Sequence, residues 1–469
     1  MARKALYLGP RLKAMRRELG LTQANMAADL EISPSYIALM ERNQRPVTAE
    51  LLMKLATTYD VDIADLASSD GDELASRLQG VMNDPLFADI DLPTLDQADI
   101  ANSFPGMAEA MIRLHTAFSE ERMALADRAA EGTVASTDGP ADPVAEARAF
   151  LAARRNFFPT LEDSAGVLAR KVASLVDMEA RIAEKHGLEV RYSDAKLLAG
   201  AVRWYDFHRG RITIGEWLDH SGRRFQLGLQ LALLEQGGAI EALLDQGRFA
   251  SEDARALVLR GLQAYWAAAL LMPYDAFRKA AIELRYDVEL LAARFSVSFE
   301  QAAHRLTTLQ KPGAEGVPFF FLRVDQAGNV SKRLDGAGFP FARHAGGCPL
   351  WNIHTVFATP GEPQAQLISL PDGEHFLSVV RTVTAGPRAF GAPNAMRAIA
   401  LVCSADRMGE LVYGDALTDR EPTPIGISCR ICHRPNCVAR SAPPIGRELL
   451  PARFRDSGMP FAFSGDVGS

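Results

Sequence analysis

The sequence predicts a multidomain α+β protein with an all-α N-terminal module, a mostly helical middle domain and a C-terminal domain built on a mixed, largely antiparallel sheet. Helical patterning dominates up to about residue 310, and β-type runs follow the breaker KPGAEG. The Gly/Pro/Ser/Thr/Asp run EGTVASTDGPADP is typical of a linker. With 469 residues, 48% of them apolar, the chain is long enough for about three domains. We expect four segments, 1–66, 67–143 (a helical connector and linker), 144–310 and 311–469.

Charge and hydropathy exclude some classes of protein. A net charge of -7 argues against a globally basic nucleic-acid coat, but it permits one local basic module. The first residues lack the apolar run of a secretory signal, and no stretch approaches the roughly 20 apolar residues of a membrane span. We therefore expect a cytoplasmic protein with no membrane partner. In that compartment five cysteines favour thiols or metal ligands over disulfides.

The first segment has the pattern of a helix-turn-helix. Thr22 suits the N-cap of a second helix, and Ser33 with Pro34 marks a sharp start for a third. Six basic residues and one acid precede residue 21, which supplies the local positive field that phosphates require. A helical protein-interaction domain is the alternative. The pattern resembles the phage-repressor-like (XRE) family, which binds double-stranded DNA.

That resemblance implies a set of DNA-contacting residues. Gln23 would lie near a phosphate, while Ser33, Ser35 and Tyr36 would meet base edges in the major groove. Residues just past the third helix can reach backbone phosphates. The candidates are therefore Gln23, Ser33, Ser35, Tyr36, Arg42, Asn43 and Arg45.

The middle domain combines predicted short strands with helices. Alternating runs in LEVRYSDA and RWYDFHRGRITIG predict short strands. The stretch 204–273 resembles the IrrE/ImmA-like metallopeptidases, which bind zinc through H-E-x-x-H. The residues at the matching positions here are Leu229, Gln230, Leu231, Ala232 and Leu233. Leu262 occupies the position of the family's later glutamate ligand. We expect no zinc and no peptidase activity, with Leu229 and Leu233 in the core.

The C-terminal third concentrates the cysteines. CRICHRPNC places Cys429, Cys432 and Cys437 at C-x-x-C-x-x-x-x-C spacing, and Cys348 and Cys403 precede them. Four thiolates can hold one zinc ion or a four-iron cluster, and His433 is an alternative fourth ligand. Spacing does not separate these options, and inert or redox-labile thiols are a third interpretation.

Taken together, the motifs resemble one family over nearly the whole chain. The segments SFEQAAHRLTTLQKPGAEGVPFFFLRVDQAGNVSKR, GGCPLWNIHTVFATPG and PIGISCRICHRPNC, behind the two N-terminal domains, look like the short-chain fatty acyl-CoA regulators. Only 70–143 is loosely matched. The resemblance implies a transcription factor that senses propionyl-CoA or acetyl-CoA. It also implies an iron-sulfur cluster, expected as 4Fe-4S with zinc as runner-up, on Cys429, Cys432, Cys437 and either Cys403 or Cys348.

Acyl-CoA binding requires cations for the phosphates and an apolar slot for the acyl chain. Candidate cations are Arg323, Arg343, Arg381, Arg388 and Arg397. A homodimer or homotetramer is expected, because a single module of this size reads too few base pairs. The rival functions are a redox- or metal-sensing transcription factor without a CoA ligand and an IrrE-like protease.

Overall fold

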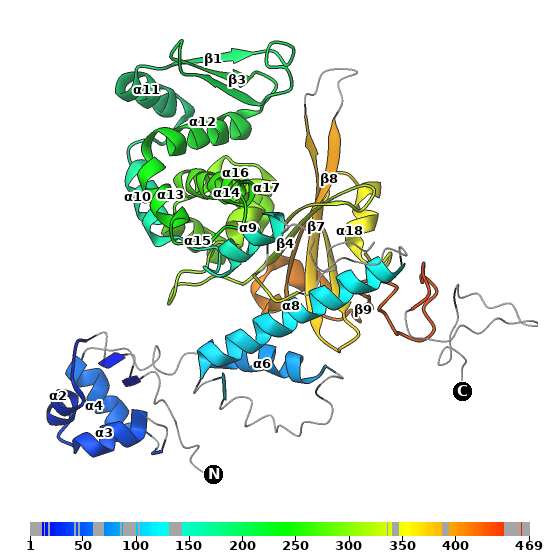
Figure 1. Cartoon of the computed structure of the whole chain (residues 1–469). Helices are drawn as coiled ribbons and strands as arrows, with labels where there is room; N and C mark the ends of the chain where they lie inside the picture. Colours follow the sequence, from blue (N-terminus) through cyan, green and yellow to red (C-terminus); the bar gives the residue numbers. More distant parts are fainter. Residues whose placement is uncertain are drawn as a thin grey trace, which may run out of the picture. The chain divides into compact units, whose positions relative to one another are not determined.

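The computed structural model confirms the α+β class (Figure 1). It describes residues 12–13, 15–16, 19–41, 44–45, 47–59, 70–84, 87, 100–101, 104–130, 143–334, 336–339, 347–386, 394–444 and 461. The chain divides into two compact units, residues 1–122 and residues 123–469.

The N-terminal module folds as three described helices around one small core. These are α2 (Gln23–Asp29), α3 (Pro34–Glu41) and α4 (Ala49–Tyr59). The Thr22 hydroxyl accepts a hydrogen bond from the Asn25 backbone N–H at 3.1 Å, and Ser33 Oγ accepts from the Tyr36 N–H at 3.2 Å. Both predicted helix starts are therefore confirmed. The core is made by Leu12, Met15, Met26, Ala27, Leu30, Ile37, Met40, Val47, Leu51 and Leu55.

Two helices follow in the connector, α6 (Asp70–Met82) and α8 (Pro105–Ala130). They pack through a cluster of Leu78, Val81, Ala108 and Ile112. Ion pairs flank this contact, because Arg77 binds Glu109 at 3.2 Å and His115 lies 3.0 Å from Asp84. The predicted linker lies almost wholly outside the described residues.

The middle domain surrounds a small sheet with helices. The sheet has the order β1-β3-β2, with β1 (Glu189–Ser193) parallel to β3 (Arg211–Gly215) and β2 (Arg203–Asp206) antiparallel to it. The predicted strands are therefore confirmed. The helices are α9 (Pro143–Ala152), α10 (Pro159–Ala169), α11 (Leu175–His186), α12 (His220–Glu235), α13 (Gly237–Leu244), α14 (Glu252–Leu271), α15 (Tyr274–Glu283), α16 (Val288–Phe295) and α17 (Phe299–Leu306).

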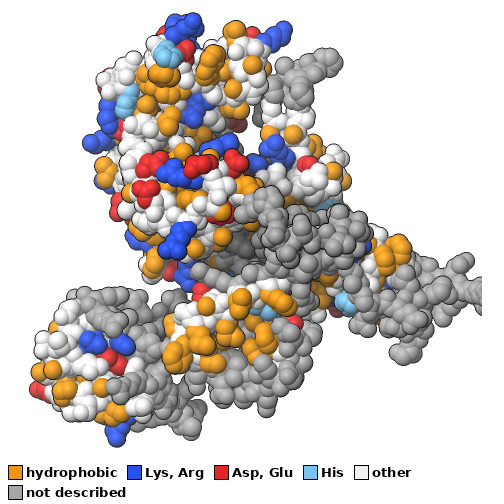
Figure 2. Space-filling view, viewed as in Figure 1, with side chains coloured by type: hydrophobic (Ala, Val, Ile, Leu, Met, Phe, Trp, Pro, Cys, Tyr) orange, Lys and Arg blue, Asp and Glu red, His pale blue; other side chains and the backbone are white. Residues whose placement is uncertain are grey.

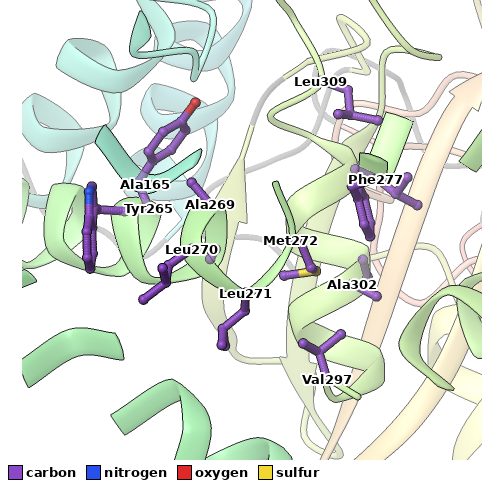
Figure 3. Packing of buried hydrophobic residues seen from close by; sticks show 14 of the residues in the cluster. Ala165, Tyr265, Ala269, Leu270, Leu271, Met272, Phe277, Val297, Ala302 and Leu309 are labelled. Atoms are coloured by element: carbon purple, nitrogen blue, oxygen red, sulfur yellow. The ribbon is translucent and has the colours of Figure 1, made fainter. Parts of the chain in front are cut away.

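Helix α14 lies at the centre of this core, part of which is shown in Figure 3. A buried ion pair crosses the same region, since Arg305 binds Glu162 at 2.7 and 2.8 Å and Tyr265 donates to the same carboxylate at 2.5 Å. Within the described residues no single helix is long and apolar enough to span a membrane; the bent pair α14 and α15 passes by composition, and both helices contribute to this core.

The C-terminal domain is a six-stranded sheet with the order β5-β4-β8-β7-β6-β9. Neighbouring strands are antiparallel except β6 and β9, which are parallel. The strands are β4 (Phe320–Asp325), β5 (Val330–Leu334), β6 (Gln364–Ser369), β7 (His375–Ala385), β8 (Ala395–Ser404) and β9 (Thr423–Pro424). A short helix, α18 (Asn352–Thr355), and 3-10 turns at Val356–Ala358, Ala405–Glu410 and Val412–Leu417 complete it.

The two faces of this sheet belong to different cores. Phe319 and Phe321 pack with the helices of the middle domain, whereas Phe320 and Leu322 pack with Trp351 on the other face. This follows from the period of two along a strand, which sends successive side chains to opposite faces. Because one core includes both α14 and the sheet, the middle and C-terminal domains form one packed unit.

Candidate DNA-binding face and cysteine site

The predicted DNA-contacting residues surround α3. Ser33, Ser35 and Arg45 are exposed and Tyr36 is half-buried. The Arg45 guanidinium lies over the Tyr36 ring, 5.3 Å from its centroid, which brings two predicted contacts together. Arg42 and Asn43 lie outside the described residues. Both serines are exposed, as base or phosphate contacts require, and the Ser33 hydroxyl also caps α3.

Gln23 has a role within the fold that its sequence position did not show. Its Nε2 donates to Glu41 at 2.7 Å, and the same carboxylate binds Arg16 Nε at 2.5 Å. Burial alone raises the pKa of Glu41, but the hydrogen bonds from Arg16 and Gln23 outweigh it and hold the pKa below its ordinary value. This network ties α2 and α3 to the preceding residues and so fixes the angle of the helix pair.

An amide of the middle domain is buried and hydrogen-bonded to an arginine. Gln230 is fully buried on α12, and its Oε1 accepts a hydrogen bond from Arg203 Nη1 of β2 at 2.6 Å. Burial lowers the pKa of Arg203. An arginine of β2 therefore binds the buried amide of α12.

One expectation for this helix is wrong. Leu233 is 44% exposed and Leu229 is half-buried, so neither is an ordinary core residue. The buried side of α12 instead runs through Leu227 and Leu231, which are also one helical turn apart. The i, i+4 spacing is therefore present, but on a different side of the helix from the predicted one.

Four of the five cysteines lie together. Cys348, Cys429, Cys432 and Cys437 line one small cavity, joined by Gly426, Arg434 and Arg440. Cys403 does not line it. Cys403 lies on β8 within the hydrophobic core, where burial raises its pKa to about 12. Of the two candidates for the fourth position, the structure brings only Cys348 to the group, and Cys403 is corrected to a core residue.

Hydrogen bonds to backbone carbonyls hold the cysteine loop against the sheet. Ile425 N–H donates to Ser369 O at 3.0 Å, which continues the short β6–β9 pairing. Arg434 donates to Ser369 O at 2.5 Å and to Ile425 O at 3.2 Å, and Arg440 donates to Arg434 O at 2.5 Å. These two arginines therefore anchor the loop.

Cys348 comes from a segment of the chain that lies well before the other three cysteines. The residues that follow it are fixed by a buried network: Trp351 Nε1 donates to Ser378 Oγ at 2.8 Å, and Ser378 Oγ donates to Asn352 at 2.9 Å. Gly426 allows the backbone to approach Cys432 closely, because a Cβ at this position would lie 2.7 Å from Cys432 Sγ. Sequence reasoning missed Gly426. The signal that could have found it was a glycine three residues before Cys429, the first cysteine of the C-x-x-C-x-x-x-x-C motif.

Backbone N–H groups point at the sulfur atoms. Gly426 and Leu350 donate to Cys348, Arg434 donates to Cys432, and the Ser441 N–H and hydroxyl lie 3.4 and 3.3 Å from Cys429 Sγ. Burial raises the pKa of Cys348 and of Cys432, while these donors act in the opposite direction. Hydrogen bonds of this kind stabilise thiolates that ligate a metal or a cluster.

The geometry differs between a single ion and a cluster. Among the described residues no group of three His, Cys, Asp or Glu side chains could hold a metal ion. A zinc ion needs its sulfurs about 3.8 Å apart, from the Zn–S length of about 2.3 Å in a tetrahedron. A four-iron core stands between its cysteines and holds them further apart. His433 is exposed and does not line the cavity.

Two of the candidate phosphate-binding arginines are paired with glutamates of the middle domain. Arg323 binds Glu300 of α17 at 2.6 Å, and Arg381 binds Glu289 of α16 at 2.8 Å. Arg381 also lies 4.9 Å from the centroid of the Phe299 ring. These two arginines connect the sheet to the helices, and their role as phosphate ligands stays a prediction.

The other three arginines differ in their placement. Arg397 is half-buried on β8, opposite Asp325 and Val383 in the register. Arg343 and Arg388 lie outside the described residues. Further contacts strengthen the same domain boundary: Arg285 binds Asp415 at 2.7 Å, and Val288 N–H donates to Tyr413 Oη at 3.0 Å.

A helix-turn-helix module, joined to a helical domain and a sheet domain with a cysteine site, defines a modular DNA-binding transcriptional regulator. Family models match along the chain: helix-turn-helix at 12–66, IrrE N-terminal-like domain at 183–307 and short-chain fatty acyl coenzyme A regulator, C-terminal, at 308–461. The chain belongs to the family of short-chain fatty acyl-CoA regulators, as its full-length relatives show.

Three curated relatives match almost end to end. A propionyl-CoA carboxylase regulator of Cereibacter sphaeroides is 39% identical over 96% of this chain and 96% of its own. The Mycobacterium tuberculosis regulators RamB and PrpR are 36% and 33% identical, each over 97% of this chain and over 98% and 96% of their own. A solved structure of a Mycobacterium tuberculosis transcriptional regulator matches with a TM-score of 0.65 and 33% identity, over 68% of this chain and all of that one.

Proposed function

We propose that this regulator senses a short-chain acyl-CoA, propionyl-CoA or acetyl-CoA, and changes its affinity for a DNA operator that controls short-chain fatty acid metabolism. The observation that carries the proposal is the shared core of the sheet domain and the middle domain. A ligand that prefers one arrangement of the sheet then also biases the packed helices. The name of the relative that regulates propionyl-CoA carboxylase supports propionyl-CoA as the first effector to test.

Thermal-shift and operator-binding titrations test this proposal. Propionyl-CoA at 100 times its dissociation constant stabilises the domain that binds it by about 2.7 kcal/mol. The expected result is a higher Tm and a changed operator affinity with propionyl-CoA or acetyl-CoA, and neither with free CoA or a long-chain acyl-CoA. No response to any short acyl-CoA would remove the effector assignment.

The cysteine site is proposed to hold a 4Fe-4S cluster, with zinc as the second candidate. Cys348, Cys429, Cys432 and Cys437 would be its ligands, and the N–H donors around them would stabilise the thiolates. Such a cluster would supply one-electron redox chemistry, and its four cysteine ligands would hold the loop to the sheet. Iron and acid-labile sulfide measured on protein purified without oxygen distinguish it from zinc.

The middle domain is proposed to be a pseudo-peptidase. An amide that accepts a hydrogen bond from Arg203 is no general base, and leucines occupy the two histidine positions. Purified protein incubated with casein and added zinc is expected to leave the substrate intact. Zinc-dependent cleavage that disappears in a Gln230→Ala variant would show the opposite.

The protein is further proposed to act as a homodimer or homotetramer, at the cytoplasmic location of its operator. A redox-sensing regulator without a CoA ligand is the second candidate function, because the cysteine group alone would support it. The two candidates separate on one comparison. Redox sensing requires operator affinity to follow the oxidation state of the cysteine site at constant acyl-CoA.

A further inference from the structure

The side-chain amine of Lys332 lacks the partner that charged groups of this protein usually have. Lys332 lies on β5, at one edge of the six-stranded sheet, and is half-buried. Figure 2 shows basic and acidic side chains next to one another over the helices of the middle domain. Within the described residues, by contrast, Lys332 Nζ makes no hydrogen bond and no ion pair. It lies 5.7 Å from the centroid of the Phe321 ring.

The register of the sheet explains this isolation. Lys332 pairs with Arg323 of β4, so two cations stand directly opposite each other on one face of the sheet. The same face carries Phe321, which packs into the core shared with the middle domain. Arg323 is already bound, because it pairs with Glu300 of α17 at 2.6 Å and donates to Ser331 Oγ at 2.9 Å. The arginine therefore takes the carboxylate, and the lysine is left beside it without one.

These surroundings favour the neutral amine. Burial and, to a smaller extent, the charge of Arg323 lower the pKa of Lys332 to about 8, although Glu300 acts in the opposite direction. Burial also holds the pKa of His304, whose ring lies 5.8 Å from that of Phe321, well below its ordinary value. At pH 7.5 a pKa of about 8 leaves about a quarter of the amine neutral, against about one part in a thousand for an ordinary lysine.

We propose that Lys332 is a site of covalent acylation by short-chain acyl thioesters. The inference rests on the proposed function for the identity of the acyl donor. The neutral amine attacks the thioester carbonyl, a C–N bond forms as the C–S bond breaks, and the departing sulfur takes up the proton that the nitrogen loses. The products are an amide on Lys332 and a free thiol, so no oxidant or further reactant is needed.

Acylation changes the contact between β5 and α17. The acylated side chain is neutral and larger, and it lies beside the Arg323–Glu300 pair that connects α17 to the sheet. It also no longer offers a cation to the Phe321 ring. The modification therefore records exposure to acyl thioesters after the free effector has dissociated.

Mass spectrometry of the full chain, incubated with the N-acetylcysteamine thioester of propionate, tests the site. This donor lacks the nucleotide of CoA, so the reaction does not depend on a CoA-binding site. At pH 7.5 Lys332 is expected to be acylated at least about tenfold faster than Lys279, although the Lys279 side chain is 79% exposed. The rate at Lys332 is expected to level off above about pH 8, where its amine is already neutral, whereas the rate at Lys279 continues to rise. A rate at Lys332 no greater than that at Lys279 would overturn the inference.

The Arg323→Gln variant separates activation of the amine from simple access. Loss of the opposite charge also frees Glu300 to pair with Lys332, and both changes raise the pKa of the amine. The acylation rate at pH 7.5 is expected to fall at least about threefold and to return close to the wild-type rate at pH 9.5. The matched control is Arg255→Gln, at a surface pair with Glu241, which is expected to leave both rates unchanged. An unchanged rate at pH 7.5 in a folded Arg323→Gln protein would contradict the proposal.

The two assignments fail separately. A protein that is acylated at Lys332, but whose Tm and operator affinity ignore propionyl-CoA, would keep the modification site and lose the proposed effector. A protein that responds to propionyl-CoA without faster acylation at Lys332 would do the reverse.

Discussion

At the scale of single residues, the cysteine site depends on which thiols share one cavity. Cys348 and Cys403 are both buried and both precede the C-x-x-C-x-x-x-x-C motif, so their sequence context does not distinguish them. The fold distinguishes them, because Cys348 lines the cavity together with Cys429, Cys432 and Cys437, whereas Cys403 lies in the hydrophobic core shared with the middle domain.

These two cysteines form a matched pair of variants. Cys348→Ala is expected to lose most bound iron or zinc, since one of four ligands is removed. Cys403→Ala is expected to keep the metal and to lower the free energy of unfolding by about 1–2 kcal/mol through lost core packing. Metal content and chemical denaturation of both proteins measure this. Equal metal loss in the two variants would contradict the assignment.

Gly426 supports a second residue-scale prediction. Gly426→Ala places a Cβ 2.7 Å from Cys432 Sγ, so the loop must shift and metal content should fall at least severalfold. Gly409→Ala is the control, because a Cβ there meets nothing within 4 Å. Full metal loading of Gly426→Ala would show that the cysteine loop does not pack closely around this glycine.

Glu235 makes stability depend on pH. Burial alone raises its pKa, but hydrogen bonds from Arg181, Lys185 and His186 outweigh this and lower the pKa to about 2. A carboxylate with a depressed folded pKa stabilises the fold above its ordinary value of 4.5, and this stability is lost as pH falls from about 4.5 to about 2.

The free energy of unfolding of the Glu235→Gln variant should therefore be about 2–3 kcal/mol lower at neutral pH. It should also fall less steeply than that of the wild type as the solution is acidified. Unfolding by denaturant at a series of pH values between 2 and 7 measures it. Glu241→Gln, at an exposed ion pair with Arg255, serves as the control and should change the free energy of unfolding by less than about 1 kcal/mol. If the acid limb of Glu235→Gln matches that of the wild type, the loss of stability in acid does not originate at Glu235.

At the scale of elements, the sequence supported the fold class, the helix starts and the strands of the middle domain, because caps and short-range periods are local signals. Thr22 and Ser33 show this. Which side of α12 is buried is not a local signal: Leu227 and Leu231 are buried, whereas Leu229 and Leu233 are not, although both pairs have the same spacing. The glutamate partners of Arg323 and Arg381 were not local signals either, because they lie on other elements.

Those arginine–glutamate pairs connect α16 and α17 to the sheet, so they are expected to carry the response to ligand. Glu289→Gln with Glu300→Gln should leave acyl-CoA binding within about twofold of wild type and reduce the effect of acyl-CoA on operator affinity. Glu283→Gln, at a surface pair with Arg294, is the matched control. Isothermal titration and operator binding measure the two quantities separately. An undiminished response would place the coupling elsewhere.

At the scale of the whole molecule, three parts have to act together: a helix-turn-helix module, a helical connector, and one packed unit of middle and C-terminal domains. The proposed ligand and the operator would bind parts of the chain that are far apart in the sequence. Thermodynamic linkage then requires two factors to be equal: the factor by which acyl-CoA changes operator affinity and the factor by which the operator changes acyl-CoA affinity.

The decisive measurement is the dissociation constant of propionyl-CoA for the full chain, with and without saturating operator DNA. We predict a change of about 5- to 150-fold, equal to the change that saturating propionyl-CoA causes in the operator dissociation constant. Tight propionyl-CoA binding that is identical with and without operator would contradict the conclusion that this protein is an acyl-CoA-responsive regulator.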